Sequence, residues 1–124
     1  MSTQPQAADV FSRHCPSREV FEDVTGKWAV LVLSALHQGP HRFGELRRRV
    51  DGVSEKMLSQ TLQVLERDGL AHREVRSTVP LHVEYTLTEL GTALAPRLLA
   101  LIDFVEDALP QVLAARAARD HRTA

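Results

Sequence analysis

The spacing of apolar residues along the chain predicts four helical segments in its first half. In the third segment Phe43, Leu46 and Val50 stand at i, i+3 and i+7, the period of a short amphipathic helix. The second segment is apolar nearly all round, and its length favours a buried helix over a strand. Glycine-containing turns at Gly39-Pro40 and Asp51-Gly52 separate these segments. The four predicted helices cover residues 16–24, 27–37, 43–50 and 54–67.

The period then changes from that of a helix to that of a strand. In residues 81–87, apolar and polar residues alternate, which is typical of a half-buried strand, and residues 70–76 are a suitable partner. Residues 77–80 would form the tip of this hairpin. Two helices joined by a short turn and followed by a hairpin are the arrangement of a winged helix-turn-helix. The expected fold is therefore mainly α with a small β-hairpin wing.

A final helical region follows Thr88, which is a suitable cap. Its apolar stripe starts at Leu90 and continues through Leu94, Leu98, Leu101, Ile102 and Val105. Pro96 should kink or split the helix near its start, and Pro110 should break it. We expect residues 1–14 to be flexible, residues 15–109 to form the domain with its dimerisation helices, and residues 110–124 to be a short helix or a frayed tail.

Length and composition restrict the class of protein. The chain has 124 residues and 44% apolar residues, which suits one domain with one packed core. No apolar run approaches the roughly 20 residues of a membrane span, and the first residues do not resemble a signal peptide. We therefore expect a cytoplasmic protein with no membrane partner. The single cysteine excludes a disulfide framework and a cysteine-rich zinc site.

Charge is distributed unevenly although the net charge is only −1. Residues 42–76 contain eight basic and six acidic residues, a net charge of +2, whereas the rest of the chain has seven basic and ten acidic residues, a net charge of −3. The excess of cations is modest, but it centres on the predicted helix-turn-helix and favours an anionic partner there.

The helix predicted over residues 54–67 carries two opposite faces. The apolar face consists of Met57, Leu58, Thr61, Leu62 and Leu65 and should pack on the core. The opposite face consists of Lys56, Ser59, Gln60, Gln63 and Arg67, and the glutamates lie on its flank. Glutamine, lysine, arginine and serine are side chains that can read base edges in a DNA major groove, and we expect Arg67 to contact the DNA backbone. The competing interpretation is a merely solvated surface.

Further cations near this helix are candidates for phosphate contacts. Arg47, Arg48 and Arg49 point about 100° apart, so only one or two of them can approach the DNA backbone, and we select Arg47. Arg42 precedes that helix, and Arg76 and His82 flank the hairpin tip, from which they would reach a neighbouring groove or phosphate. Plain solvation is the alternative for each wing contact.

The chain resembles the HxlR-type winged helix-turn-helix regulators of bacteria. The resemblance extends over about residues 15 to 105 and rests on an ordered series of short motifs. They are Cys15-Pro16, Gly26-Lys27-Trp28, Gly39-Pro40, Arg42-Phe43-Gly44-Glu45-Leu46, Ser54-Glu55-Lys56-Met57-Leu58, Leu62, Leu65-Glu66, Asp68-Gly69-Leu70, Val83-Glu84-Tyr85 and Leu87-Thr88-Glu89-Leu90-Gly91.

The resemblance implies a homodimeric, DNA-binding regulator that represses or activates a nearby gene from a double-stranded DNA operator. It also implies that the first and last helices form the dimer interface. The apolar residues that would do so are Val20, Phe21, Leu94, Leu98, Leu101, Ile102 and Val105. Independently of the resemblance, the apolar stripe on the last helix requires another surface to cover it. A rival from another class is a winged-helix protein-interaction module without specific DNA binding, which the near-neutral net charge favours.

Cys15 stands at the start of the first predicted helix, where the helix dipole lowers the pKa of a thiol. Some relatives are similar in using a cysteine at this place to sense oxidants or electrophiles, which makes Cys15 a candidate sensor. The alternative is that Cys15-Pro16 only starts the helix. With one cysteine, the remaining reactions are a disulfide between subunits, a mixed disulfide or an adduct.

Other chemistry is not expected. The six histidines are scattered and provide no metal-ligand context, and no nucleophile–base pair or phosphate-binding loop occurs, so we predict neither an enzyme nor a cofactor. Trp28 belongs either to the core or dimer interface, or to the wall of a cavity for a small-molecule effector of unspecified identity.

Overall fold

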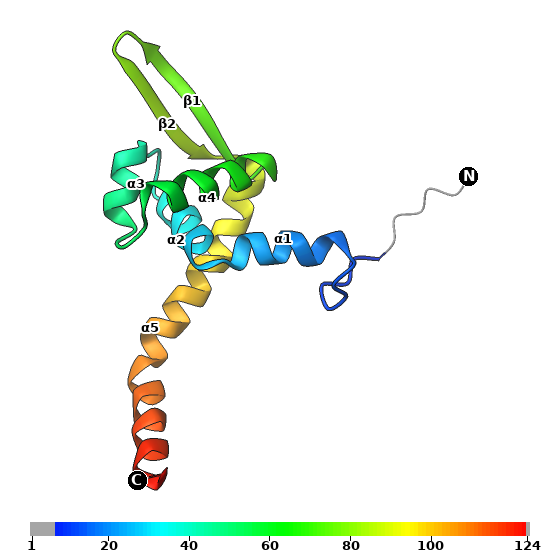
Figure 1. Cartoon of the computed structure of the whole chain (residues 1–124), viewed down its shortest axis with the longest axis vertical. Helices are drawn as coiled ribbons and strands as arrows, with labels where there is room; N and C mark the ends of the chain where they lie inside the picture. The colour runs from blue at the N-terminus through cyan, green and yellow to red at the C-terminus, as the bar shows by residue number, and fades with distance from the viewer. Residues whose placement is uncertain (1–6, 124) are drawn as a thin grey trace, which may run out of the picture.

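The computed structural model describes residues 7–123, and they form five helices and one hairpin (Figure 1). The order of elements agrees with the winged helix-turn-helix predicted from the sequence. The elements are α1 Pro16–Thr25, α2 Lys27–Leu36, α3 Phe43–Arg49, α4 Glu55–Arg67, β1 Ala71–Thr78, β2 Leu81–Leu87 and α5 Glu89–Thr123.

Local signals set the ends of the central helix, α4. The Ser54 hydroxyl accepts a hydrogen bond from the Met57 amide at 3.1 Å, so the predicted N-cap is confirmed. At the other end Gly69 has a φ of 73°, which an L side chain rarely adopts, and its amide donates to the Glu66 carbonyl. The chain therefore leaves α4 sharply and enters β1.

The core lies between α2 and the inner faces of the other elements. Val32 and Leu33 of α2 are fully buried, as are Leu46 of α3 and Leu58 and Leu65 of α4. The apolar character of α2 on all sides follows from this central position, because helices contact it from several directions.

The two strands form an antiparallel hairpin in which Ala71 pairs with Leu87 and Thr78 with Leu81. Only the base of this wing is anchored: Tyr85 is buried, and its backbone exchanges hydrogen bonds of 3.1 and 2.7 Å with that of His41. Towards the tip Leu81 is exposed, so the alternation of β2 corresponds to burial only near the domain. The tip therefore extends beyond the helices (Figure 1).

The last helix differs from the prediction. α5 runs through Glu89–Thr123 and contains Pro96 and Pro110, so the expected break at Pro110 and the separate short helix after it are wrong. Proline removes the bond to the carbonyl four residues earlier, which here belongs to Thr92 and Glu106. Both of these residues are exposed, so water can reach the carbonyls that have lost their partners.

α5 also extends far beyond the domain. Its 35 residues correspond to about 52 Å of helix, and its second half projects away from the other elements in Figure 1. No helix among the described residues is long and apolar enough to cross a membrane. The segment from Asp9 to Cys15 folds into turns beside α1, where Arg18 donates to the Val10 carbonyl at 2.7 Å. The predicted flexibility of residues 1–14 stays a prediction, and residues 1–6 lie outside the described residues.

Candidate DNA-binding surface

The exposed face of α4 carries the row of polar residues predicted from the helical wheel. Lys56, Gln60 and Gln63 are exposed and Ser59 is half-buried, while Leu58, Leu62 and Leu65 are buried on the opposite side. Hydrophobic contacts thus fix the rotation of α4 about its axis and direct the amides and the lysine outward.

One residue of the predicted apolar face lies elsewhere. Met57 is 40% exposed and borders a cleft next to Trp28. The helical wheel assigned it to the core because it shares the arc of Leu58 and Leu65, but no neighbouring element covers it completely.

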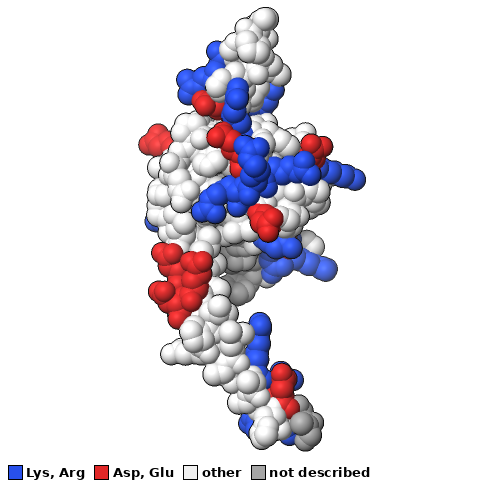
Figure 2. Space-filling view, turned by 90° about the vertical axis from the view of Figure 1, so that its left-hand side faces the viewer, with Lys and Arg blue, Asp and Glu red and all other residues white. Residues whose placement is uncertain are grey.

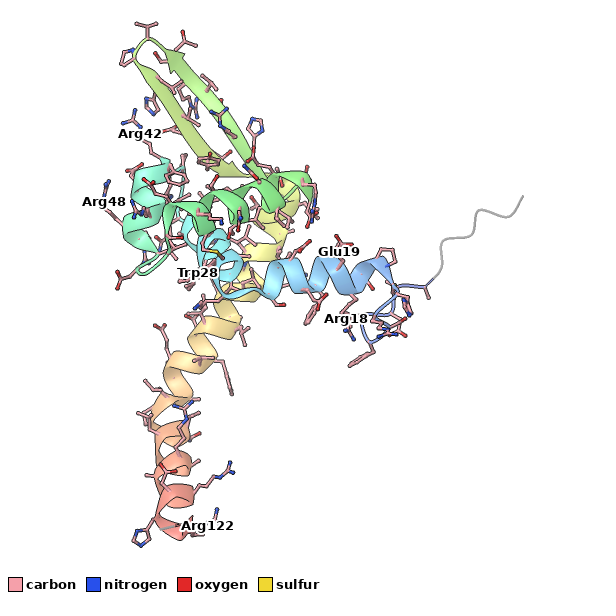
Figure 3. All side chains as sticks on the ribbon, viewed as in Figure 1. Arg18, Glu19, Trp28, Arg42, Arg48 and Arg122 are labelled. Atoms are coloured by element: carbon pink, nitrogen blue, oxygen red, sulfur yellow. The ribbon has the colours of Figure 1, made fainter. Side chains whose placement is uncertain are left out.

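The predicted phosphate-binding residues of α3 lie beside α4. Arg42 is the N-cap of α3, and its amide donates to Glu45 Oε1 at 2.7 Å, which leaves the guanidinium exposed. Arg47 Nη1 is 3.3 Å from Glu55 Oε1, an exposed pair across the turn between α3 and α4. Figure 3 shows Arg42 and Arg48 extending away from the core on this side, and Figure 2 shows Lys and Arg side chains gathered on the same face, with Asp and Glu side chains among them.

Arg67, the last residue of the predicted row, is engaged within the protein. Its guanidinium lies 2.9 Å from Asp23 Oδ2 of α1, 3.2 Å from Asp68 Oδ1 and 3.8 Å from Glu19. Burial raises the pKa of the Asp23 carboxyl, and a hydrogen bond with Asp68 raises it further. These ion pairs turn Arg67 towards α1 and away from the row formed by the other four side chains.

The two predicted residues of the wing meet at one carboxylate. Arg76 Nε donates to Glu84 Oε1 at 2.9 Å, and His82 Nε2 is 3.4 Å from Glu84 Oε2. Desolvation opposes the ionised form of Glu84, but hydrogen bonds from Arg76 and His82 leave its pKa lowered. Glu74 lies 3.3 Å from Arg76 as well, so the positive charge of this part of the wing is largely balanced by carboxylates.

A short segment before α1 surrounds Cys15 with hydrogen-bond donors. The sulfur accepts from the Asp9 amide at 3.4 Å and from the Ser17 hydroxyl at 3.1 Å. These bonds, that of the Asp9 amide most of all, lower the pKa of the thiol because they stabilise the thiolate. Sequence reasoning anticipated the helix N-terminus as the cause, but the contact with Asp9 depends on the turn that brings residues 9 and 15 together.

The residues predicted for the dimer interface divide into two groups. Val20, Phe21, Leu101 and Val105 are exposed, with 53% and 54% for the last two, and Leu94 and Ile102 are half-buried. Leu98 is only 6% exposed and belongs to the core of its own chain. Large apolar residues that the prediction omitted are also exposed on α5, namely Leu90, Phe104, Leu109, Val112 and Leu113.

These features, a helix-turn-helix with an outward row of amides and cations and a hairpin beside it, are those of a DNA-binding regulator, and comparison with known proteins supports this. The model of the HxlR-like helix-turn-helix family matches residues 23–112. The chain belongs to the HxlR-like helix-turn-helix family. As a member of this family of transcriptional regulators it is not an enzyme.

Individual transcriptional regulators are similar over nearly the whole chain. The HTH-type transcriptional regulator YtfH of Escherichia coli K12 is 51% identical over 116 residues, which are 94% of this chain and 92% of YtfH. The structure of the transcriptional regulator ytfH from Salmonella typhimurium is 52% identical and covers 90% of this chain and 99% of its own, with a TM-score of 0.84.

A further structural neighbour is the redox regulator HypR in its oxidized form. It is 38% identical and covers 75% of this chain and 96% of its own, with a TM-score of 0.69. The winged helix predicted from the sequence is thus confirmed. Within residues 7–123, no group of three His, Cys, Asp or Glu side chains is arranged to hold a metal ion.

Proposed function

We propose that the protein is a homodimeric, sequence-specific regulator of transcription that binds a pseudo-palindromic operator through α4. The observation that carries the proposal is the outward row formed by the exposed Lys56, Gln60 and Gln63 and the half-buried Ser59, opposite a buried leucine face. Glutamine pairs with adenine and lysine with guanine through the major groove, whereas the serine hydroxyl can bond to a base edge or donate to a phosphate oxygen. A regulator of this kind acts on chromosomal DNA, so we expect it in the cytoplasm.

Contacts to the DNA backbone come, in this proposal, from four residues around that row. Arg42 and Arg47 lie beside α4 at the helix-turn-helix, and Arg76 and His82 lie on the wing. The ion pairs of Arg76 and His82 with Glu84 would exchange for phosphate contacts on binding. Arg67 differs from these residues because three carboxylates bind its guanidinium and two of them, Asp23 and Glu19, draw it towards α1, so we leave it out of the proposed surface.

A second copy of this chain is the proposed partner of the exposed apolar residues on α1 and α5. Phe21 of α1 and Leu101, Phe104 and Val105 of α5 are more than half exposed. A long amphipathic helix with such a face is unfavourable in water unless another surface covers it. Two copies joined along these helices would present two α4 helices to successive major grooves, about 34–36 Å apart or a multiple of that distance.

Apolar space beside these residues supports the same partner. A groove of about 520 Å³ lies between α1 and the first turns of α5, and its walls include Val20, Val24, Leu70, Leu90 and Leu94. Apolar side chains of the second copy would fill it. Val105→Asp should therefore shift the protein from dimer to monomer in sedimentation experiments, while Val79→Asp at the exposed hairpin tip should leave the dimer intact.

Cys15 is, in this proposal, a thiol through which oxidants or electrophiles change DNA binding. Its lowered pKa increases the reactive thiolate, and redox regulators such as HypR are among the structural neighbours. Two Cys15 thiols of a dimer would form one disulfide, giving two protons and two electrons to an oxidant such as diamide. An electrophile would instead add to the thiolate. Diamide should change the DNA affinity of the wild type and leave that of Cys15→Ser unchanged. If it left the DNA affinity of the wild type unchanged as well, the sensing role would be excluded.

The test of the main proposal is the affinity for the DNA upstream of the gene itself, measured by fluorescence anisotropy at fixed salt. Gln60→Ala should cost about 1–3 kcal/mol and relax the preference at one base pair. Gln111→Ala, an exposed glutamine on α5, is the matched control and should have no effect. Equal affinity of Gln60→Ala and wild type would show that α4 does not read the operator.

The salt dependence of binding separates this function from a protein-interaction module. Each neutralised phosphate releases counterions, so affinity should fall as salt rises, and Arg47→Ala should make that slope shallower for all sequences alike. A slope near zero would favour the interaction module.

A further inference from the structure

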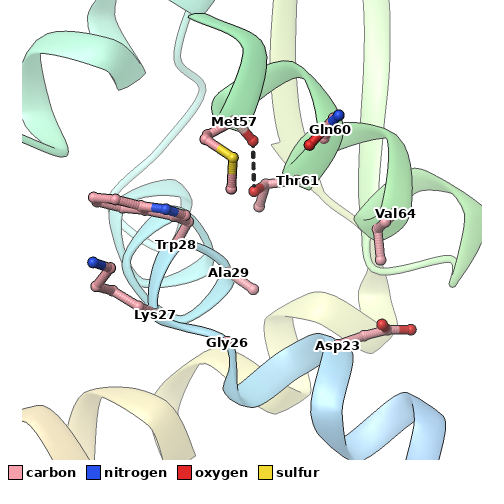
Figure 4. A pocket seen from close by; sticks show the side chains of 9 residues that line it. All are labelled: Asp23, Gly26, Lys27, Trp28, Ala29, Met57, Gln60, Thr61 and Val64. Atoms are coloured by element: carbon pink, nitrogen blue, oxygen red, sulfur yellow. Dashed lines mark hydrogen bonds between the residues drawn. The ribbon is translucent and has the colours of Figure 1, made fainter. Parts of the chain in front are cut away.

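A cleft separates α4 from the start of α2 and has not been used by the function proposed above. Its volume is about 240 Å³, and Figure 4 shows it between Trp28, Met57 and Val64, with Gln60 on the α4 side. This volume lies below the roughly 300–1,000 Å³ of pockets for drug-sized ligands. The cleft therefore has the size for a molecule with a single ring.

The walls of the cleft are mainly apolar. The half-buried Trp28 ring forms one side of the cleft. In Figure 4 the Met57 side chain lies on one face of this ring and Lys27 on the other. Val64 and Ala29 continue the apolar surface, and the Thr61 hydroxyl is already satisfied by the Met57 carbonyl at 2.8 Å. An indole face and a thioether favour a flat aromatic ring, because both are polarisable and contact rings closely.

Charge at the cleft favours an anion. The Lys27 ammonium lies 4.3 Å from the centroid of the Trp28 ring, so it holds a cation at the rim. The one carboxylate of the lining, Asp23, is paired with Arg67 at 2.9 Å. A ligand carboxylate or phenolate would thus meet Lys27, while Arg67 offsets part of the negative charge of Asp23.

We propose that this cleft binds a small single-ring aromatic anion, with its ring against the Trp28 and Met57 side chains and its charged group at the edge of the indole, towards Lys27. On the basis of the function proposed above, such a ligand should also lower the affinity of the protein for operator DNA. Gln60 borders the cleft and belongs to the proposed DNA-reading row, so its amide cannot serve the ligand and a base at once. The ring of Trp28 also reaches the turn before α4, since a Cβ on Gly52 would lie 3.8 Å from Trp28 Cη2. Because the coupling between two binding sites is reciprocal, operator DNA must lower the affinity for the ligand by the same factor.

Trp28 is the only tryptophan of the chain, so its fluorescence reports directly on the cleft. The probe is 4-nitrobenzoate, whose nitro group quenches indole emission, and its uncharged counterpart is 4-nitrobenzamide. We expect saturable quenching by 4-nitrobenzoate at concentrations where the amide quenches weakly. Linear quenching without saturation, or equal saturation by both probes, would overturn the anion site.

Substitutions locate the binding. Lys27→Gln should weaken the binding of 4-nitrobenzoate about five-fold and leave the binding of 4-nitrobenzamide unchanged. Arg122→Gln, which removes a cation at the far end of α5, should change the binding of neither probe. Met57→Ala should weaken the binding of both probes, because it removes one apolar wall of the cleft. The Met57 side chain is 40% exposed, so its loss should leave the core intact. Unchanged binding in both Lys27→Gln and Met57→Ala would place the probe outside this cleft.

The effect on DNA is measured separately. With the wild type, saturating 4-nitrobenzoate should lower operator affinity at constant ionic strength, and Lys27→Gln should lose that response at the same probe concentration. If operator binding without probe fails, the proposed function is wrong while the quenching still tests the site. If operator and probe both bind but do not affect one another, the coupling is wrong.

Discussion

Replacing Gly91 with alanine should destabilise the fold, because the start of α5 passes unusually close to the strand that follows α4. A Cβ built on Gly91 would lie 2.1 Å from the Leu70 carbonyl oxygen and 3.1 Å from the Leu87 side chain. The first distance is far shorter than any contact between a carbon and an oxygen, and the opposing atom belongs to the backbone. The substitution therefore requires α5 or β1 to move.

The cost follows from that movement. Overpacking of a buried site costs about 1–3 kcal/mol, and a fixed backbone atom places this site at the upper end. The Leu70 carbonyl also accepts a hydrogen bond from the Thr88 amide at 3.1 Å, and losing it adds about 1 kcal/mol. We expect a loss of about 4 kcal/mol in the free energy of unfolding, which lowers the thermal midpoint of a chain of this length by about 15 °C.

Urea unfolding followed by Trp28 fluorescence and by circular dichroism measures the loss, with wild type and variant at one protein concentration because a dimer's stability depends on it. Gly44→Ala is the matched control. Gly44 is a helical residue of α3 whose added Cβ meets only Arg48 Nη1 at 3.5 Å, so alanine there should stabilise by about 0.5–1 kcal/mol. If Gly91→Ala unfolded at the urea midpoint of the wild type, the close approach of α5 to Leu70 would be refuted.

Three further predictions concern a thiol, an ion pair and a proline. Ser17→Ala should raise the pKa of Cys15, measured by iodoacetamide rates against pH, because it removes a donor to the thiolate. Because the pKa of the Cys15 thiol is lower in the folded than in the unfolded protein, the thiolate stabilises the fold at pH values above the unfolded pKa. This stabilisation is lost as the pH falls through the folded pKa. Ser17→Ala should therefore reduce the free energy of unfolding only at alkaline pH. Arg67→Ala should leave the salt slope of DNA binding unchanged and cost about 1–3 kcal/mol in urea unfolding, because it leaves the largely buried Asp23 and Asp68 carboxylates without their cation; a shallower slope would return Arg67 to the DNA surface. Pro110→Ala should restore the bond to the Glu106 carbonyl and stabilise the second half of α5 by up to about 3 kcal/mol, and unchanged amide hydrogen exchange around residue 110 would contradict it.

The sequence by itself determined the elements and the direction of the side chains of α4. Periodicity is a local property, and caps such as Ser54 and Gly69 act within a few residues, so the bounds of α4 and the exposure of Gln60 and Gln63 could be read from the chain. The family resemblance rests on the same local motifs, and the family match over residues 23–112 confirms it.

Tertiary structure decided what lies against each face. A helical wheel gives the direction of a side chain around its own axis but not the partner it meets, so only the fold brought Asp23 to Arg67 across 44 residues. For the same reason Leu98 is inside the domain while Leu101, three residues on, is outside, and Met57 borders a cleft instead of the core. Contacts between distant residues depend on how the helices pack together, and that packing is a property of the whole chain.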